Sequence, residues 1–367
     1  MKWLERNRMK LVLVGFLATT VLGGGNAKAD FTFGEPTNLG ATVNTSFNDA
    51  GPSIAADGLT LFFVSKRPGG FGDNDLWLTE RPTTSAPWQE PVNLGTEING
   101  PARDQGPNIS SDGLSLFFMS DRSGGHGLLD LWLSVRATTE DSWGAPVNLG
   151  PTINTSVDDA SPCLSADRLT LFFSSDRPGG HGGRDLWMTT RPSEDGSWGQ
   201  PANLGSVVNT SAYDNAPAIS VDGLLVFFWS NRPGGYGNRD LWMTRRSTKD
   251  DPWSPAVNVG EAINTPAKES NPCISADGRI LYFWSDRIGG FGHNDLYQAP
   301  VIPIVDLNSD GIVDALDMCI MVDNWGTDNS LCDIGPMPWG DGIVDVQDLI
   351  VLSEHLFEKL PGRPIQP

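Results

Sequence analysis

A segment of eleven residues recurs along this chain at a constant interval. It reads RPGGFGDNDLW at 67–77 and returns as RSGGHGLLDLW (122–132), RPGGHGGRDLW (177–187), RPGGYGNRDLW (232–242) and RIGGFGHNDLY (287–297). The step is 55 residues each time, and segments reading NLG or NVG keep it too, opening at Asn38, Asn93, Asn148, Asn203 and Asn258. A fixed period of this length is typical of a solenoid or a propeller.

Each unit is predicted to fold as short strands. Aromatic and β-branched runs such as LLVFFWS (224–230) alternate with clusters of Gly, Pro, Asn and Asp, and no segment of 30–300 has a convincing helical period. Four strands per unit would make one propeller blade, whereas solenoid units are usually shorter and need capping repeats. The fifth unit lacks its last strand, and FGEPTNLG at 33–40 is a spare copy of it. We therefore expect a mainly β fold, a five-bladed propeller over 30–300 closed by an N-terminal strand.

The repeated pattern S.DG..LFF.S.R.GG.G..DLW resembles the WD40-like repeat of TolB-type propellers. The resemblance covers residues 33–300 in all five copies. It implies the fold and says little about function, because such propellers include partner-binding proteins and enzymes alike.

The N-terminus has the layout of a secretory signal peptide. A basic segment precedes the apolar run LVLVGFLATTVL, and small residues ending in AKA predict cleavage after Ala29. Removing residues 1–29, with five basic residues and one acid, would change the net charge from −20 to −24. Such acidity argues against a nucleic-acid partner, and no other stretch is long and apolar enough for a membrane span. We expect a secreted, periplasmic or cell-surface protein.

Residues found in every copy are expected to build the blades. An Asp precedes each Leu-Trp or Leu-Tyr, and an Arg opens each glycine loop, at Asp75, Asp130, Asp185, Asp240, Asp295 and at Arg67, Arg122, Arg177, Arg232, Arg287. We expect each Asp to accept hydrogen bonds from the backbone or from the Arg of its blade. The alternative, a calcium site in each glycine loop, fits poorly because calcium-binding β-rolls repeat every nine residues or so.

Two rings of residues are candidates for a ligand-binding face. One follows the glycine pairs: Phe71, His126, His181, Tyr236 and Phe291. The other comprises the acids before the inner strands: Asp49, Asp104, Asp159, Asp214 and Glu269. Both are predicted on one face, with the acids nearer the central opening. Aromatic rings around carboxylates would suit a carbohydrate, or a protein partner. The alternative is that the aromatic residues pack between blades and the acids cap strands.

Catalysis finds little support in these motifs. A glycoside hydrolase needs two carboxylates in unlike environments, whereas the five acids occupy nearly equivalent places, with Glu269 the least equivalent. No HExxH or GxSxG motif is present. We predict an exported, non-catalytic binding or scaffold protein, with two alternatives. One is a glycoside hydrolase acting on polysaccharide through carboxylates at the propeller centre, and the other is a purely structural surface protein.

The four cysteines are too few for a disulfide framework. Cys163 and Cys273 occupy equivalent positions two blades apart, so we expect buried free thiols. Cys319 and Cys332 flank a predicted helix, and a disulfide between them is left open.

Beyond a linker at 301–305 the composition changes to that of a calcium-binding segment. DLNSDGIVDALD at 306–317 carries oxygen ligands at calcium-loop spacing, with a glycine for the sharp bend. The predicted Ca²⁺ ligands are Asp306, Asn308, Asp310, the Ile312 carbonyl, Asp314 and Asp317. The pattern returns 31 residues later, which adds Asp341, the Ile343 carbonyl, Asp345 and Asp348.

This pair of loop–helix units resembles a type I dockerin over 306–357. The resemblance implies a small all-α calcium-binding module at 306–367, a cohesin-like partner, and a link to extracellular polysaccharide breakdown or surface assembly. The second unit departs from the pattern, since Met337 and Trp339 stand where its first two side-chain ligands belong. Either Asp333 reaches in across an enlarged loop, or the second site is weak or completed by water. Ala315–Leu316 and Val346–Gln347 replace the hydroxyl pairs typical of cohesin recognition.

Overall fold

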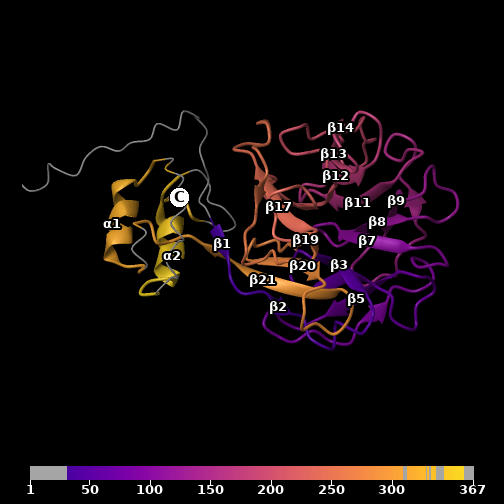
Figure 1. The fold of residues 1–367 in the computed structure, drawn as a ribbon, viewed down its shortest axis with the longest axis horizontal. Coiled ribbons are helices and arrows are strands. Elements are labelled where there is room, and N and C mark those ends of the chain that lie inside the picture. The colour runs from indigo at the N-terminus through magenta and orange to yellow at the C-terminus, as the bar shows by residue number, and fades with distance from the viewer. Residues whose placement is uncertain (1–30, 309–311, 328, 330–331, 336–342, 359–367) are drawn as a thin grey trace, which may run out of the picture.

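The computed structural model describes residues 31–308, 312–327, 329, 332–335 and 343–358. The predicted signal peptide and the predicted ligands Asp310 and Asp341 lie outside the described residues. Within them, five small antiparallel sheets surround one axis, and two short helices lie to one side, next to strand β1 (Figure 1). The expected mainly β, five-bladed propeller is confirmed.

Each blade is a four-stranded meander whose first strand is innermost. Blade one contains β3 (Asp49–Ile54), β4 (Thr60–Ser65), β5 (Asp75–Glu80) and β6 (Val92–Asn93). Blade two contains β7 (Asp104–Ile109), β8 (Ser115–Ser120), β9 (Asp130–Val135) and β10 (Val147–Asn148). Blade three contains β11 (Asp159–Leu164), β12 (Thr170–Ser175), β13 (Asp185–Thr190) and β14 (Ala202–Asn203). Blade four contains β15 (Asp214–Ile219), β16 (Leu225–Ser230), β17 (Asp240–Arg245) and β18 (Val257–Asn258). Blade five contains β19 (Glu269–Ile274), β20 (Ile280–Ser285), β21 (Asp295–Pro303) and, from the N-terminus, β2 (Thr37–Asn38). The inner strands contact one another in the order β3, β7, β11, β15, β19 and back to β3, so the ring is closed.

The paired phenylalanines of the second strands explain how the blades stack. Phe62 and Phe63 point to opposite sides of their sheet, as successive strand residues must, yet both are fully buried. Phe62 packs against Leu116 and Phe118 of blade two, and Phe63 packs in the cluster that includes Trp284 of blade five. Because each sheet lies between two others, its middle strands are apolar on both faces.

The N-terminal strand closes the fifth blade, as predicted. Thr37 and Asn38 of β2 pair with Gln298 and Tyr297 of β21. A second strand, β1 (Phe31–Phe33), pairs with Val301–Pro303 at the far end of β21. Three of the five residues expected to form a linker at 301–305 are therefore strand, because β1 supplies their backbone with partners.

The described C-terminal residues contain two nine-residue helices, α1 (Ala315–Asp323) and α2 (Val346–Glu354). Each begins with a capping box made by two aspartates, Asp314 with Asp317 and Asp345 with Asp348. Their apolar sides share a small core with Val305, Val313 and Val344. No helix among the described residues is long and apolar enough to cross a membrane.

Candidate functional site: an axial funnel

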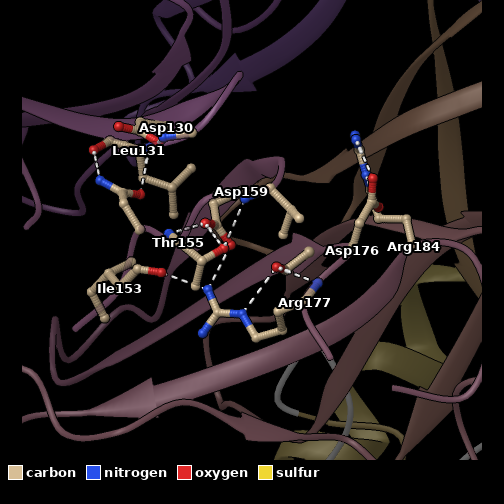
Figure 2. Close-up of polar contacts among 12 residues, drawn as sticks. Asp130, Leu131, Ile153, Thr155, Asp159, Asp176, Arg177 and Arg184 are labelled. Carbon is tan, nitrogen blue, oxygen red and sulfur yellow. Dashed lines mark hydrogen bonds and ion pairs between the residues drawn. The ribbon is translucent and has the colours of Figure 1, made fainter. Parts of the chain in front are cut away.

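The acids before the inner strands form buried ion pairs. In blade three, shown in Figure 2, Asp159 accepts hydrogen bonds from Arg177 Nη2 at 2.5 Å and from the backbone nitrogen and hydroxyl of Thr155 at 2.6 and 2.8 Å. The same Arg177 nitrogen also donates to the Ile153 carbonyl at 2.5 Å. The Asp159 side chain is 0% exposed, so its oxygens offer no surface to a ligand in this structure.

The same network occurs in all five blades. The ion pairs are Arg67–Asp49 (2.7 Å), Arg122–Asp104 (2.5 Å), Arg232–Asp214 (2.5 Å) and Arg287–Glu269 (3.2 Å). Glu269 makes the bonds of its aspartate counterparts, accepting from Thr265 and Ser285, so its greater length does not give it a separate environment. Burial raises the pKa of Asp104 and of Glu269 despite these hydrogen bonds. The five acids hold the strand starts in place, which is the structural alternative set out from the sequence.

The arginines therefore pair with a different acid from the one that opens the third strand. Asp75 accepts instead from the backbone nitrogens of Phe71 and Gly72, at 2.5 and 3.1 Å, and from the Asn93 amide at 3.2 Å. Two hydrogen-bond donors were expected for Asp75. The backbone is confirmed as a donor, whereas the arginine of the blade does not bind Asp75. Arg67 lies beside Asp49 because antiparallel pairing of β3 with β4 places Asp49 opposite Ser65, two residues before Arg67.

The glycine loop is shaped by close contacts. A Cβ on Gly70 would clash with Asp75 Oδ2, and one on Gly72 would clash with the carbonyl oxygens of Gly100 and Ala102 in the next unit. Glycine is needed here so that the loop can wrap the carboxylate and rest on the next blade. The loop is a structural hairpin, and the carboxylate takes the place that a bound anion would need.

The aromatic and histidine ring lies at the same end of the blades as the acids. Asp49 pairs with Ser65 and Ser65 with Asp75, which puts the glycine loop and the start of the inner strand at one end of the sheet. All five ring residues are exposed: Phe71, His126, His181, Tyr236 and Phe291. They do not border the axial cavity described next, so the structure does not gather them into one site with the acids.

On the propeller axis at this end lies a funnel of about 500 Å³ lined by residues from every blade. Its wall includes Asn48, Asn74, Arg103, Gln105, Arg184, Tyr213, Asn215, Trp229, Arg239, Asn271, Trp284 and Asn294. It leads to a neck of about 40 Å³ ringed by Pro52, Pro107, Pro162, Pro217 and Pro272. Small-ligand sites are usually lined mainly by apolar side chains, whereas this wall is mostly polar with a few aromatic side chains, which suits a polar ligand.

An irregularity of each inner strand shapes the neck. Strand pairing shifts register between Asn215 and Ala218 in blade four, and likewise in the other blades. At this bulge the backbone is left-handed in every blade, with φ of 58° at Gly51, 57° at Gly106, 52° at Ser161, 55° at Ala216 and 48° at Asn271. Bulges bend a strand and re-aim its side chains, so this repeated bulge shapes the floor of the funnel in every blade.

At two positions that contribute to the funnel wall, the five copies of the repeat differ. At the residue before each inner-strand acid stand Asn48, Arg103, Asp158, Tyr213 and Lys268. On the second strand stand Val64, Met119, Ser174, Trp229 and Trp284. The buried acid–arginine network, by contrast, is repeated almost without change. Sequence reasoning missed the funnel, although the same rule, that variable positions mark an asymmetric site, would have selected these positions.

In the C-terminal segment the ends of the first predicted calcium loop lie together. Asp317 Oδ1 accepts from the backbone nitrogens of Leu307 and Asn308 at 2.7 and 3.1 Å. Asp348 makes the equivalent bonds to Ile334 and Gly335, at 2.5 and 2.7 Å. Among the described residues no group of three or more His, Cys, Asp and Glu side chains is arranged around a common point as a metal site. The donors that are described, hard oxygens of Asp306, Asn308, Asp314 and Asp317 on one short loop, fit Ca²⁺ in kind.

The described cysteines carry free thiols; this confirms the predicted buried free thiol for Cys163, whereas Cys273 is free but only partly buried. Both border the neck of the funnel, and burial raises their pKa to about 12 and about 11. Cys319 is exposed and Cys332 is buried, and the structure holds no bond between them.

Fold and funnel together define a five-bladed β-propeller with an axial cavity. No protein-family model and no curated protein matches the chain. Among solved structures, a thermostable family-43 glycoside hydrolase is similar with a TM-score of 0.50 at 9% identity, over 71% of this chain and 91% of that one. An α-L-arabinofuranosidase from Lactobacillus brevis has a TM-score of 0.47 at 14% identity, over 70% and 90% of the two chains. TolB from Acinetobacter baumannii has a TM-score of 0.44 at 16% identity, over 71% of this chain and 56% of TolB. At 9% identity the likeness to the family-43 structure shows the fold alone.

Proposed function

We propose that this protein is an exported, non-catalytic binding protein whose propeller holds a glycan in the axial funnel. The observation that carries the proposal is the contrast between a repeated scaffold and a funnel wall whose residues change from blade to blade. A scaffold needs the same residue in each copy, whereas an asymmetric ligand needs different ones. The proposed ligand site therefore lies nearer the propeller axis than the two rings of residues that the sequence suggested.

The chemistry of the wall suits a sugar. Amide side chains such as Asn48, Asn215 and Gln105 donate and accept hydrogen bonds with hydroxyl groups. Tyr213, which is 49% exposed at the rim, offers an aromatic face on which a sugar ring can stack. A volume of about 500 Å³ accommodates a small ligand or a short end of a polymer.

Binding is favoured over hydrolysis by the state of the nearby carboxylates. Asp73 is the one carboxylate among the residues described as lining the funnel, and it pairs with Lys66 at 2.9 Å. The buried inner-strand acids are all held by arginines. A glycosidase requires an acid and a second carboxylate facing the scissile bond, and the described wall presents no such pair.

The test is a glycan array followed by calorimetry with the mature protein, residues 30–367. Two tyrosines of blade four form a matched pair, since Tyr213 lines the funnel, Tyr236 lies in the glycine loop, and each is 49% exposed. We expect Tyr213→Ala to weaken binding by about tenfold or more, as loss of an aromatic contact does, and Tyr236→Ala to bind normally. If Tyr236→Ala weakened binding and Tyr213→Ala did not, the ligand site would lie at the aromatic residues of the glycine loops instead of in the funnel.

Two further results would replace the proposal. Release of reducing ends from the bound polysaccharide would establish the glycoside hydrolase alternative. If no glycan bound, the purely structural surface role would be the alternative to adopt.

We also propose that the C-terminal segment is a calcium-folded, dockerin-like module that joins the protein to a cohesin-like partner. Support comes from two matching loop–helix units with twin aspartate capping boxes. Bound Ca²⁺ would supply a hard cation that gathers the loop oxygens and thereby stabilises the helices. Asp306, Asn308, Asp314 and Asp317 would hold it in the first loop, together with Asp310 and the Ile312 carbonyl.

Calcium titration of the mature protein tests this, with heat and helix content as readouts. Asp317→Asn should abolish the tighter site, while Asp348→Asn, at the equivalent place in the second loop, should leave it intact. The difference is expected because the second loop lacks two side-chain ligands, having Met337 and Trp339 there. No heat and no gain of helix in the unaltered protein would refute the metal assignment.

A further inference from the structure

The funnel gathers positive charge in an acidic protein. The chain carries 45 acidic and 25 basic residues, yet the charged residues described as lining the funnel are Lys66, Arg103, Arg184, Arg239 and a single acid, Asp73. Three of these cations are engaged. Lys66 pairs with Asp73 and Arg103 with Asp121, at 2.9 and 2.7 Å, and Arg184 is held by two aspartates.

Arg239 differs from these three. No carboxylate forms an ion pair with its guanidinium in the part of the chain that the structure describes. The group lies over the ring of Trp229, 4.5 Å from its centroid, and is only partly exposed. Burial lowers the pKa of Arg239, partly opposed by the charge of Asp286, which is itself bound to Lys268 at 2.9 Å. Arginine stays charged at neutral pH even so.

The repeat itself shows what is missing around Arg239. Arg184 is its counterpart one unit earlier, and there Asp158 and Asp176 bind the guanidinium at 2.5 and 2.9 Å; the contact with Asp176 is drawn in Figure 2. The corresponding residues of blade four are Tyr213 and Asn231. The exchange keeps local structure, because Asn231 Oδ1 accepts from the Tyr213 backbone nitrogen at 2.9 Å, as Asp121 and Asp286 do for their own blades. Blade four thus keeps the arginine and lacks both of its acids.

A partly desolvated cation without a counterion is unfavourable unless something supplies the opposite charge. The guanidinium is also the side chain best suited to grip a carboxylate or sulfate through paired hydrogen bonds. Trp229 lies against Arg239, and Tyr213 of the same blade lines the same funnel.

We infer that the funnel selects an acidic glycan, with Arg239 binding an oxyanion carried by the sugar. This inference rests on the proposed glycan-binding function and adds the class of ligand. Carboxylate and sulfate groups share the chemistry required, so the experiment separates them.

The probes are two matched pairs of polysaccharides measured against the mature protein by calorimetry. Polygalacturonate is compared with its methyl ester, and dextran sulfate with dextran. We expect tight binding of at least one charged form and at least about tenfold weaker binding of its neutral partner, because charge-assisted hydrogen bonds are the stronger kind. The charged form that binds identifies carboxylate or sulfate as the anion.

Three variants then test the role of Arg239. Arg239→Gln should weaken binding of the charged form by about tenfold or more. Asn231→Asp keeps Arg239 but supplies the carboxylate that Asp176 gives Arg184, and it should weaken binding similarly without disturbing the fold. Lys249→Gln removes one positive charge at an exposed position outside the funnel and should bind as the unaltered protein does.

The outcomes distinguish the inference of an acidic ligand from the proposed glycan-binding function. Equal binding of charged and neutral forms, or normal binding by Arg239→Gln, would overturn the acidic-ligand inference and leave glycan binding standing. Failure of all four polysaccharides to bind would overturn the acidic-ligand inference, whereas an array on which no glycan binds would overturn both.

Discussion

Arg177 and Asp159 form an ion pair of 2.5 Å in blade three, with side chains only 8% and 0% exposed. The pair ties the second strand to the start of the innermost one, and its four counterparts do the same around the ring. The guanidinium also lies over Phe173 and Trp187, at 4.8 and 5.3 Å from their ring centroids, so the pair joins polar and apolar parts of the blade.

Removing the acid from this pair should be costly. Asp159→Ala leaves the Arg177 charge buried without its carboxylate, and we expect a loss of about 3–5 kcal/mol in the free energy of unfolding. Asp121→Ala is the matched control, since its partner Arg103 is 46% exposed, and it should cost about 1 kcal/mol or less. Urea denaturation monitored by tryptophan fluorescence measures both. Similar losses in the two variants would show that burial does not set the strength of these pairs.

The N-terminal closure should contribute measurably to stability. Phe33 of β1 is 8% exposed and packs edge-on against Phe227 with ring centroids 6.3 Å apart. Phe33→Ala should therefore lower the free energy of unfolding by about 3–5 kcal/mol, as loss of a buried phenylalanine does. Phe47, which is 41% exposed, provides the control, and Phe47→Ala should change stability by about 0.5 kcal/mol or less. A negligible effect of Phe33→Ala would mean that the ring holds together without β1.

The thiols should differ sharply in reactivity. Burial raises the pKa of Cys163 to about 12 and of Cys273 to about 11, so at pH 8 neither forms the reactive thiolate. Cys319 is exposed, and we expect it to react with a thiol reagent in the native protein, followed by the others only after denaturation. Mass spectrometry of the labelled protein reads this out, and Cys319→Ser should abolish native labelling. Native labelling of Cys163 would contradict the packed neck.

Acid should weaken one surface ion pair in a defined pH range. Although burial acts to raise it, hydrogen bonds from Lys249, Ser165 and Leu169 lower the pKa of Asp167 to about 2. A carboxyl group with a lowered folded-state pKa adds stability above its unfolded pKa of about 3.9, and this is lost as the pH falls toward 2. Because Lys249 is 53% exposed, Asp167→Asn should cost only about 1 kcal/mol or less at pH 7.

Urea denaturation at pH 7, 4 and 2.5 tests this dependence. The difference between Asp167→Asn and the unaltered protein should shrink steadily across the series. A difference that stays constant with pH would rule out the ion pair as its source.

Much of the architecture could be predicted from the repeat. The strict period, the strand-like runs and the spare segment at 33–40 together required five blades and a closing strand, and β2 pairs where that reasoning placed it. The extra pairing of β1 with Val301–Pro303 was not predicted, because neither segment carries the repeated motif.

The sequence by itself determined the number of blades and the means of closure, because each copy of the motif contains its own strands and turns. Tertiary structure decided which acid each arginine binds and where the ligand site lies. Arg67 meets Asp49 only when β3 and β4 pair, and Tyr213, Trp229 and Arg239 meet only when their blade takes its place in the closed ring. Such contacts depend on the packing of strands distant in sequence, which a local pattern does not encode.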